Sequence, residues 1–365
     1  MSGRLANVLV MIAIAAVSGG GTLLGMTVWE QPVSSRSKPA VIEGDGTRGP
    51  RGMMWIPGGE FMMGGADRPA KSNEQPAHKV RVHGFWMDRT AVTNAQFAAF
   101  VAATGYVTTA ERPPDWETLK SQLPPGTPKP ADEAMVPGAM VFVGTEQPVD
   151  LSDYTQWWRY VPGANWRHPQ GPQNSIAGKD DYPVVQVSYE DTLAYARWAG
   201  KRLPTEAEWE FAARGGLNKA TYAWGNDFAP QGRKLANVWE GSAQPFPVTG
   251  LRAESAHETS RVCTFAPNGY GLCDMTGNVW QWVADWYRAD AYSQAAQGAE
   301  PVDPQGPRDS FDPDEPGTPS DAPERVIRGG SFLCNQAYCL SYRPSARRGS
   351  DPYTSMSHIG FRLVE

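Results

Sequence analysis

The segment NGYGLCDMTGNVWQW, from Asn268 to Trp282, brings glycines and large aromatic residues close together. The whole chain has the same character, with 38 Gly, 32 Pro and 14 Trp in 365 residues. Glycine and proline interrupt regular elements, whereas tryptophan supplies large surfaces for burial. The chain is therefore predicted to be a loop-rich domain held together by aromatic side chains, and not a helical bundle or a repeat array.

The hydrophobic content indicates a folded protein, and the net charge argues against a nucleic-acid-binding protein. Hydrophobic residues make up 41% of the chain, which is enough for a sizeable core. The formal net charge is −6, so the chain has no basic excess with which to neutralise phosphates. No nucleic-acid partner is expected.

The first residues differ from the rest of the chain. After Arg4, residues 5–29 carry no charge and are most apolar at Val8–Val17. A short positive start, an apolar centre and small residues near Ser18 are typical of a secretory signal peptide. The stretch is also long enough to span a bilayer if it is not cleaved. Residues 1–29 are therefore predicted to be a signal peptide or a membrane anchor, and the protein to be exported to the periplasm or cell envelope.

The remainder divides into a linker and one domain. Residues 30–51 are rich in Ser, Pro, Gly and charge without an apolar period, which is typical of a flexible linker. No internal boundary is found within residues 52–365, so a single domain is expected there. Residues 113–182 and 298–324 lack periodicity, and such long stretches inside a compact domain are usually functional loops.

Regular elements are indicated at several places. A strand pair is expected around Pro57-Gly58-Gly59, and the alternation at residues 80–87 predicts one half-buried strand. Helices are predicted from Thr93 to Gly105, from Ser188 to Gly200 and from Thr205 onward, because each begins with a capping box. Strands and helices in this order predict an α+β fold.

These segments resemble, in this order, the sulfatase-modifying factor family, whose enzymes generate formylglycine. The matching segments are Trp55–Gly64, Gly84–Phe100, Pro183–Gly216, Tyr222–Gly225, Ala236–Trp239, Asn268–Trp282, Arg328–Phe332 and Gly360–Arg362. They cover about residues 52–365, and the resemblance implies a single loop-rich, C-type-lectin-like domain. Because the family includes non-catalytic members, the match specifies the fold better than the activity.

Four cysteines lie in the last third of the chain: Cys263, Cys273, Cys334 and Cys339. An even number of cysteines in an exported protein favours disulfides, and spacing by itself predicts one between Cys334 and Cys339. For Cys263 and Cys273, a disulfide and two buried free thiols are equally consistent with the sequence.

The resemblance gives the pair Cys334 and Cys339 a second role. In the copper-dependent oxidases of the resembled family, two cysteines at this spacing follow a Gly-Gly-Ser motif and bind Cu(I). Thiolates are soft ligands that prefer Cu(I) to hard cations, and two of them leave room for a further sulfur. Cys334 and Cys339 are thus implied to be catalytic copper ligands, which also form a reversible disulfide when no metal is bound.

The implied reaction is the oxidation of a cysteine in an unfolded sulfatase polypeptide to Cα-formylglycine. O2 is the oxidant, and the target segment is of the Cys-x-Pro-x-Arg type. Binding of the substrate sulfur to Cu(I) would acidify the thiol and fix its position.

Other site residues follow from the same resemblance. Ser331 and Trp280 correspond to catalytic-pocket residues, although Ser331 is also consistent with a turn serine and Trp280 with a core residue. Tyr338, Asn335 and His358 are implied to contact the substrate. Asn335 stands where many members have His, and His358 stands where they have Asn.

Arg343 and Arg347 also have counterparts in the resembled family. They follow the second cysteine in a familiar Tyr-Arg and Ala-Arg context, and both are expected to be salt-bridged structural residues.

Two structural calcium loops are also implied. The first consists of Asp274, Gly277, Val279 and Gln281, whose side-chain and backbone oxygens suit a hard cation. Gln281 replaces the usual Glu, and the lost negative charge should weaken binding. The second consists of Asn237, Val238, Glu254 and Ala256.

Two other functions compete with the sulfatase-directed oxidase. One is a non-catalytic envelope protein that binds protein or glycan through the lectin-like fold. The retained cysteine pair argues against it. The other is an oxidase for a different protein target.

Overall fold

The structure is a computed structural model that describes residues 39–66, 69–239, 245–249, 258–315, 317–336 and 338–365. The predicted export segment, residues 1–29, lies outside the described residues. Within the described residues, no helix has the length and apolar character needed to cross a membrane. In the predicted linker, the amide of Gly44 donates to the carbonyl of Met53, and the carbonyl of Ile42 accepts from the amide of Trp55. This part of the linker therefore packs on the domain.

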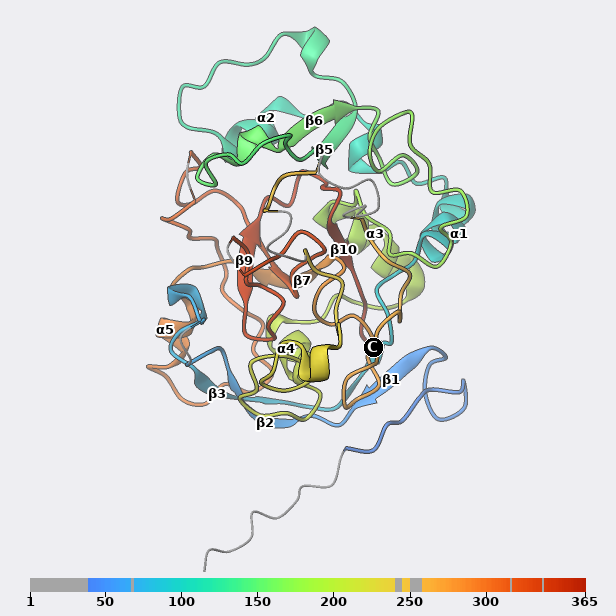
Figure 1. Cartoon of the computed structure of the whole chain (residues 1–365), viewed down its shortest axis with the longest axis vertical. Coiled ribbons are helices and arrows are strands. Elements are labelled where there is room, and N and C mark those ends of the chain that lie inside the picture. The colour runs from blue at the N-terminus through green and yellow to red at the C-terminus, as the bar shows by residue number, and fades with distance from the viewer. Residues whose placement is uncertain (1–38, 67–68, 240–244, 250–257, 316, 337) are drawn as a thin grey trace, which may run out of the picture. The chain divides into compact units, whose positions relative to one another are not determined.

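Short strands and helices alternate with long connections (Figure 1). The strands are β1 (Met53–Ile56), β2 (Gly59–Met63), β3 (His78–Val82), β4 (Phe85–Asp88), β5 (Gly138–Phe142), β6 (Trp158–Pro162), β7 (Trp280–Trp286), β8 (Arg325–Arg328), β9 (Arg347–Ser350) and β10 (Ile359–Phe361). The α-helices are α1 (Asn94–Thr104), α2 (Trp116–Leu119), α3 (Tyr189–Ala199), α4 (Glu206–Arg214) and α5 (Ala291–Ala295). Single 3-10 turns are η1 (Ser72–Glu74), η2 (Thr109–Glu111), η3 (Lys120–Gln122), η4 (Asp132–Ala134), η5 (Tyr154–Gln156) and η6 (Pro230–Gly232).

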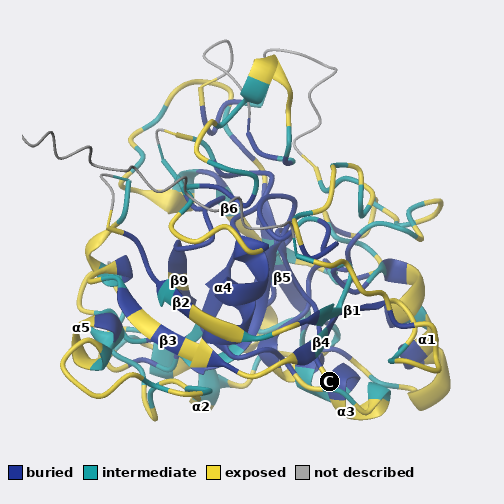
Figure 2. Cartoon of the chain, turned by 90° about the horizontal axis from the view of Figure 1, so that it is seen from below, coloured by how far each residue is buried: buried dark blue, intermediate teal, exposed yellow. Residues whose placement is uncertain are grey.

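In the described part of the chain, the largest sheet has the strand order β10-β7-β8-β9. β10 runs parallel to β7, whereas β7 with β8 and β8 with β9 are antiparallel. Every residue of α4 is buried, and this helix lies among the dark blue elements at the centre of Figure 2. Trp209 of α4 donates its indole N–H to Gln281 of β7 at 2.9 Å, which fixes the helix on the sheet.

The N-terminal strands form a bent two-stranded ribbon. β1 pairs with β4 and β2 pairs with β3, so the predicted pairing of the two strands around Pro57-Gly58-Gly59 is wrong. The single strand predicted at residues 80–87 is instead two strands, β3 and β4, separated by His83-Gly84. The two interruptions face each other, since a Cβ on Gly58 would lie 2.6 Å from the backbone carbonyl carbon of His83. Gly58 also has φ +70°, which glycine adopts without strain.

The three predicted helices are confirmed. Each begins with the predicted capping box and ends at a glycine in the left-handed conformation. The capping pairs are Thr93 with Gln96, Ser188 with Asp191 and Thr205 with Glu208, and the glycines are Gly105, Gly200 and Gly215.

The predicted loop at residues 113–182 contains a hairpin that periodicity missed. β5 and β6 pair antiparallel from Gly138 with Pro162 to Phe142 with Trp158, and they lie at the top of Figure 1. β5 is buried at four of its five positions, so it has no polar face that would give an alternating pattern.

Candidate active site

Cys334 and Cys339 are joined by a disulfide, with Cα atoms 4.6 Å apart. Their sulfurs therefore converge, as a reversible disulfide or a shared metal ion requires. Cys334 is only 1% exposed and belongs to the hydrophobic core, whereas Cys339 is partly buried at its edge. A molecule from solvent would consequently reach the pair from the side of Cys339.

The glycines before the cysteines let the chain cross itself closely. Gly329 and Gly330 have φ +93° and +68°, and a Cβ on Gly330 would lie 2.9 Å from the backbone carbonyl carbon of Ser341. Only glycine permits both the backbone conformation and this contact. The connection between β8 and β9, residues 329–346, carries both cysteines, and we call it the cysteine loop. The crossing brings the start of this loop against its end.

Local hydrogen bonds shape the loop. The amide of Cys334 donates to the Ser331 carbonyl at 3.0 Å, and that of Cys339 to the Asn335 carbonyl at 3.2 Å. Asn335 Oδ1 accepts from the Tyr338 amide at 2.9 Å. The fully buried Ser331 hydroxyl oxygen accepts from the Leu333 amide at 3.2 Å, which is the turn-serine arrangement. A catalytic role for Ser331 stays a prediction.

Aromatic rings connect the cysteine loop to His358. Tyr338 stacks on Phe246 with centroids 4.8 Å apart, and Phe246 lies 5.9 Å from Phe142. Trp158 lies 5.8 Å from Phe142, and the His358 ring lies 4.8 Å from Trp158. We call these five residues the aromatic wall. The sequence patterns did not reveal its middle members. For Phe142 and Trp158 the lack of periodicity in residues 113–182 was the available signal, and for Phe246 there was none.

His358 is held neutral in this environment. Burial, and then the positive charge of Arg348, lowers the pKa of His358 to about 3. Its Nδ1 atom is buried and has no hydrogen-bond partner among the described residues. Buried polar atoms are normally hydrogen-bonded, so this one indicates a partner that the structure does not contain. The predicted contact with substrate would supply such a partner.

Trp280 joins His358 to the core around the cysteines. Its amide donates to the His358 carbonyl at 2.9 Å. Its side chain is 2% exposed and lies in the same hydrophobic cluster as Cys334. The structure therefore brings Trp280, His358 and the cysteine loop into one region.

A cavity of about 510 Å³ lies along the same strand as part of the aromatic wall. Met140 of β5 lines it, and the Met140 amide donates to the Ser355 carbonyl at 3.0 Å. Two residues further on, Phe142 belongs to the wall, and its amide donates to the Ser357 hydroxyl at 3.2 Å. The cavity and the wall are thus consecutive along β5 and residues 355–358.

The first predicted calcium set does not fit calcium. Gln281 Oε1 accepts from Trp209 Nε1 at 2.9 Å and from Arg362 Nε at 2.8 Å. Both groups only donate, so the amide nitrogen must face the other way, where it donates to the Asp274 carbonyl at 2.9 Å. Gln281 therefore presents an N–H where a hard cation needs an oxygen.

The second calcium set stays a prediction. Asn237 Nδ2 donates to the Glu258 carbonyl at 2.9 Å, and Val238 is buried. Glu254 and Ala256 lie outside the described residues. In the part of the chain that the structure describes, no three His, Cys, Asp or Glu side chains gather as a metal site.

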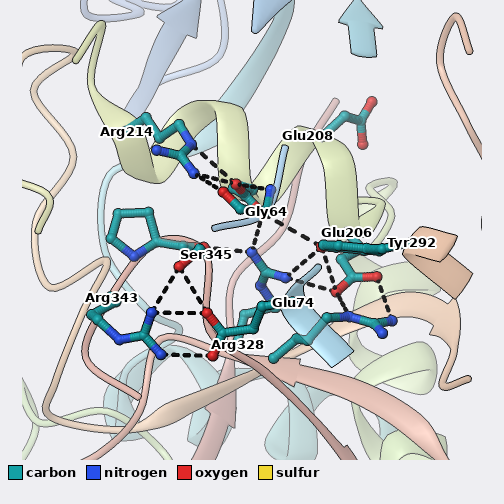
Figure 3. Close-up of polar contacts among 12 residues, drawn as sticks. Gly64, Glu74, Glu206, Glu208, Arg214, Tyr292, Arg328, Arg343 and Ser345 are labelled. Atoms are coloured by element: carbon teal, nitrogen blue, oxygen red, sulfur yellow. Dashed lines mark hydrogen bonds and ion pairs between the residues drawn. The ribbon is translucent and has the colours of Figure 1, made fainter. Parts of the chain in front are cut away.

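The remaining cysteines and arginines are now placed. Cys263 and Cys273 form a disulfide, which decides between the two alternatives for this pair. As predicted, Arg343 is buried and salt-bridged to Glu74 at 2.6 Å (Figure 3). Arg347 is also buried and salt-bridged, to Glu206 at 2.6 Å.

A converging pair of sulfurs fits Cu(I), because two soft ligands can hold it at low coordination number. The partly buried pair beside an aromatic wall is suited to thiol redox chemistry or to a soft metal ion. Residues 38–365 match the family described as the sulfatase-modifying factor enzyme 1-like domain. The chain belongs to this family of formylglycine-generating enzymes and their relatives.

Individual relatives agree with the family. A formylglycine-generating enzyme from Thermomonospora curvata is 47% identical over 316 residues, which cover 86% of this chain and 93% of the relative. A mouse protein named inactive C-alpha-formylglycine-generating enzyme 2 is 34% identical over 317 residues, covering 86% of this chain and 85% of the relative. The structure of PvdO from Pseudomonas aeruginosa superposes with a TM-score of 0.51 at 24% identity, over 86% and 93% of the two chains. These matches confirm a single, loop-rich domain of mixed α and β structure.

Proposed function

We propose that this protein is an oxygen-dependent oxidase that converts a cysteine of an unfolded sulfatase polypeptide to Cα-formylglycine. The observation that carries the proposal is the converging pair Cys334 and Cys339, one partly exposed, in a chain of this family. Family membership alone does not carry it, since one of the relatives is named inactive.

Cys334 and Cys339 would hold Cu(I) as thiolates once their disulfide is reduced. When bound, Cu(I) supplies the electron transfer that lets O2 oxidise the substrate carbon. The protein's share is to bring the two sulfurs together and to keep one side of the pair open to a substrate thiol. Cys339, at the edge of the core, provides that side.

The overall reaction balances with a thiol as co-reductant. The substrate CH2–SH group becomes CHO, its sulfur leaves as H2S, and one oxygen atom of O2 leaves as water. O2 accepts four electrons, of which two come from the substrate and two from two thiols that form a disulfide. A supply of thiol reductant is therefore part of the proposal.

The other residues would bind and orient the peptide. The aromatic wall excludes water beside the cysteine loop, and the cavity along β5 has room for residues that flank the target cysteine. Neutral His358 would accept a hydrogen bond from a substrate group at its Nδ1 atom. Asn335 and Tyr338 would border the site next to the cysteines. Ser331 and Trp280 complete the predicted pocket.

The test uses the reduced, Cu(I)-loaded protein with a Cys-x-Pro-x-Arg peptide, O2 and a thiol. Formation of the aldehyde is followed by mass spectrometry after capture with a hydrazide. The double variant Cys334→Ser/Cys339→Ser is expected to lose both copper and turnover. The matched variant Cys263→Ser/Cys273→Ser, which loses the other disulfide, should keep both. If the wild type binds one Cu(I) and forms no aldehyde, the proposed substrate is wrong.

The alternative is a non-catalytic envelope protein that binds protein or glycan through a lectin-like fold. The relative named inactive keeps this alternative in view. Loss of the cysteine pair separates the two functions, because a binding protein would retain its partner when both cysteines are replaced by serine.

Export to the periplasm or cell envelope belongs to the same proposal. The two disulfides support an oxidising compartment. The N-terminal segment would be the signal peptide or anchor, and the domain would have the C-type-lectin-like topology of the resembled family.

A further inference from the structure

The cysteine loop, residues 329–346, is the connection between β8 and β9. Arg328 ends β8 and Arg347 begins β9, and the two are register partners in the sheet. Arg328, Arg343 and Arg347 are 0%, 1% and 3% exposed. Three buried guanidinium groups thus stand at the two ends of the segment that carries Cys334 and Cys339.

The entry to the loop is held by α4. Arg328 donates to Glu206 Oε1 at 2.7 Å (Figure 3). It also donates to Glu210 Oε2 at 2.6 Å and to the Pro344 carbonyl. Arg347 binds both oxygens of Glu206, at 2.6 and 2.9 Å. These contacts fix the strands themselves, on either side of the loop.

The exit from the loop is held differently, by a residue that lies more than 250 positions earlier in the chain. Arg343 donates to Glu74 Oε2 at 2.8 Å and to Glu74 Oε1 at 2.6 Å, a bidentate pair. Its third nitrogen, Nε, donates to the Leu340 carbonyl at 2.8 Å. Ser345 adds a hydrogen bond to Glu74 Oε2 at 3.0 Å.

Leu340 is the residue directly after Cys339. A planar guanidinium that is clamped by Glu74 on one edge can hold the Leu340 carbonyl with the other edge only in one orientation. We propose that Glu74 and Arg343 are positioning residues, which hold the partly exposed Cys339 at the distance from Cys334 that the dithiol chemistry needs. This inference rests on the proposed function only in treating the pair as the working group of the protein.

The physical consequence concerns the effective concentration of one sulfur near the other. Both the disulfide and a two-sulfur Cu(I) site depend on this closeness, so both weaken when the exit of the loop becomes free to move. A merely structural ion pair would lower the stability of the fold and leave these two equilibria unchanged.

The experiment compares Glu74→Gln and Arg343→Lys with the wild type in the full chain. Arg343→Lys keeps the charge but cannot hold Glu74 and Leu340 together. The matched control is Glu208→Gln, which removes another bidentate pair, with Arg202 at 2.7 Å for both bonds, away from the loop. Each protein is equilibrated with glutathione buffers, its thiols are alkylated, and both disulfides are quantified by mass spectrometry. Cu(I) affinity is measured by competition with a chromophoric chelator.

In both variants we expect the equilibrium constant between the Cys334–Cys339 disulfide and its dithiol to shift about tenfold toward the dithiol. This corresponds to a reduction potential roughly 30 mV higher. Cys263–Cys273 in the same molecule should not shift, and Cu(I) affinity should fall by a similar factor. Glu208→Gln should change neither quantity. The proposal is overturned if Glu74→Gln and Arg343→Lys unfold at lower temperature while both equilibria stay at the wild-type values. If Glu74→Gln does not fold, Arg343→Lys decides in the same way. The glutathione measurement needs no turnover, so a wild type that forms no aldehyde would refute the function and leave this test intact.

Discussion

Gln281 donates its side-chain amide to the backbone carbonyl of Asp274 at 2.9 Å. The two residues are the first and last members of the first predicted calcium loop. Because Trp209 and Arg362 can only donate, they force the oxygen of Gln281 to their side and leave the nitrogen toward Asp274. A hydrogen bond thus closes the loop where a carboxylate would turn an oxygen toward a cation.

Replacing Gln281 with Glu should therefore create calcium dependence. The new carboxylate would keep one oxygen on Trp209 and Arg362 and turn the other toward the Asp274 carbonyl, where Ca²⁺ can bridge them. We expect CaCl2 to raise the unfolding temperature of Gln281→Glu. At a hundredfold excess over Kd, the free energy of unfolding should rise by about 2.7 kcal/mol. The first loop should give the wild type no calcium response, so the gain is measured as the difference between Gln281→Glu and the wild type.

Gln281→Met is the matched control, since it removes the hydrogen bond without offering an oxygen. It should be less stable than the wild type and respond to calcium no more than the wild type does. If Gln281→Glu gains no more stability from calcium than the wild type does, the first loop does not behave as described.

Acid should destabilise the fold through His358. Its pKa is lowered from the ordinary 6.5 to about 3, so the folded state binds its proton less readily than the unfolded state. The contribution of His358 to the free energy of unfolding is complete above pH 6.5. It is lost as the pH falls toward 3, by up to about 1.4 kcal/mol per pH unit. Urea unfolding at pH 7 and pH 4.5 should show a smaller loss for His358→Asn than for the wild type. His83→Asn, at a side chain 75% exposed, should behave like the wild type.

Alkaline pH should act on Glu324 in the opposite direction. Burial, and then the charges of Asp312 and Glu315, raises the pKa of Glu324 from 4.5 to about 8. The folded state favours the protonated form of Glu324. The contribution of this group to the free energy of unfolding is therefore complete below pH 4.5 and is lost as the pH rises toward 8. Glu324→Gln should therefore melt above the wild type at pH 8.5, and the difference should shrink at pH 5. An equal difference at both values would mean that the carboxyl is not the cause.

Loss of Arg328 should cost much more stability than loss of an exposed arginine. Arg328→Met removes the arginine from Glu210 Oε2 and one of the two arginines from Glu206, all fully buried, while Arg214 stays on Glu210 Oε1. This loss costs about 3–5 kcal/mol. Arg202→Met removes a partner of Glu208, but the Arg202 side chain is 51% exposed, so about 1 kcal/mol or less is expected. Denaturant unfolding measures both values. Similar losses in the two variants would show that the buried network does not stabilise the fold as argued.

Local patterns were sufficient for the helices. Thr93, Ser188 and Thr205 each carry their capping partner three residues on, and this bond forms within one turn whatever the rest of the chain does. The same reasoning failed for the strands at residues 53–63 and 80–87, because strand pairing is a contact between distant segments. Alternation marks the faces of a strand and does not name its neighbour.

The candidate site divides in the same way. The motif around Ser331, Cys334 and Cys339 was visible in the sequence, and the converging sulfurs agree with it because the two residues are five positions apart. Phe142, Trp158 and Phe246 were not visible, since they come from separate segments and share no spacing with the cysteines.

The sequence by itself determined the helix caps and the closeness of Cys334 to Cys339, both of which depend on neighbours within a few residues. The tertiary structure decided which strand pairs with which, that Glu74 meets Arg343, and that Gln281 turns its nitrogen toward Asp274. These contacts depend on where the folded backbone brings distant side chains, and on donors such as Arg362 that no local pattern connects to their acceptors.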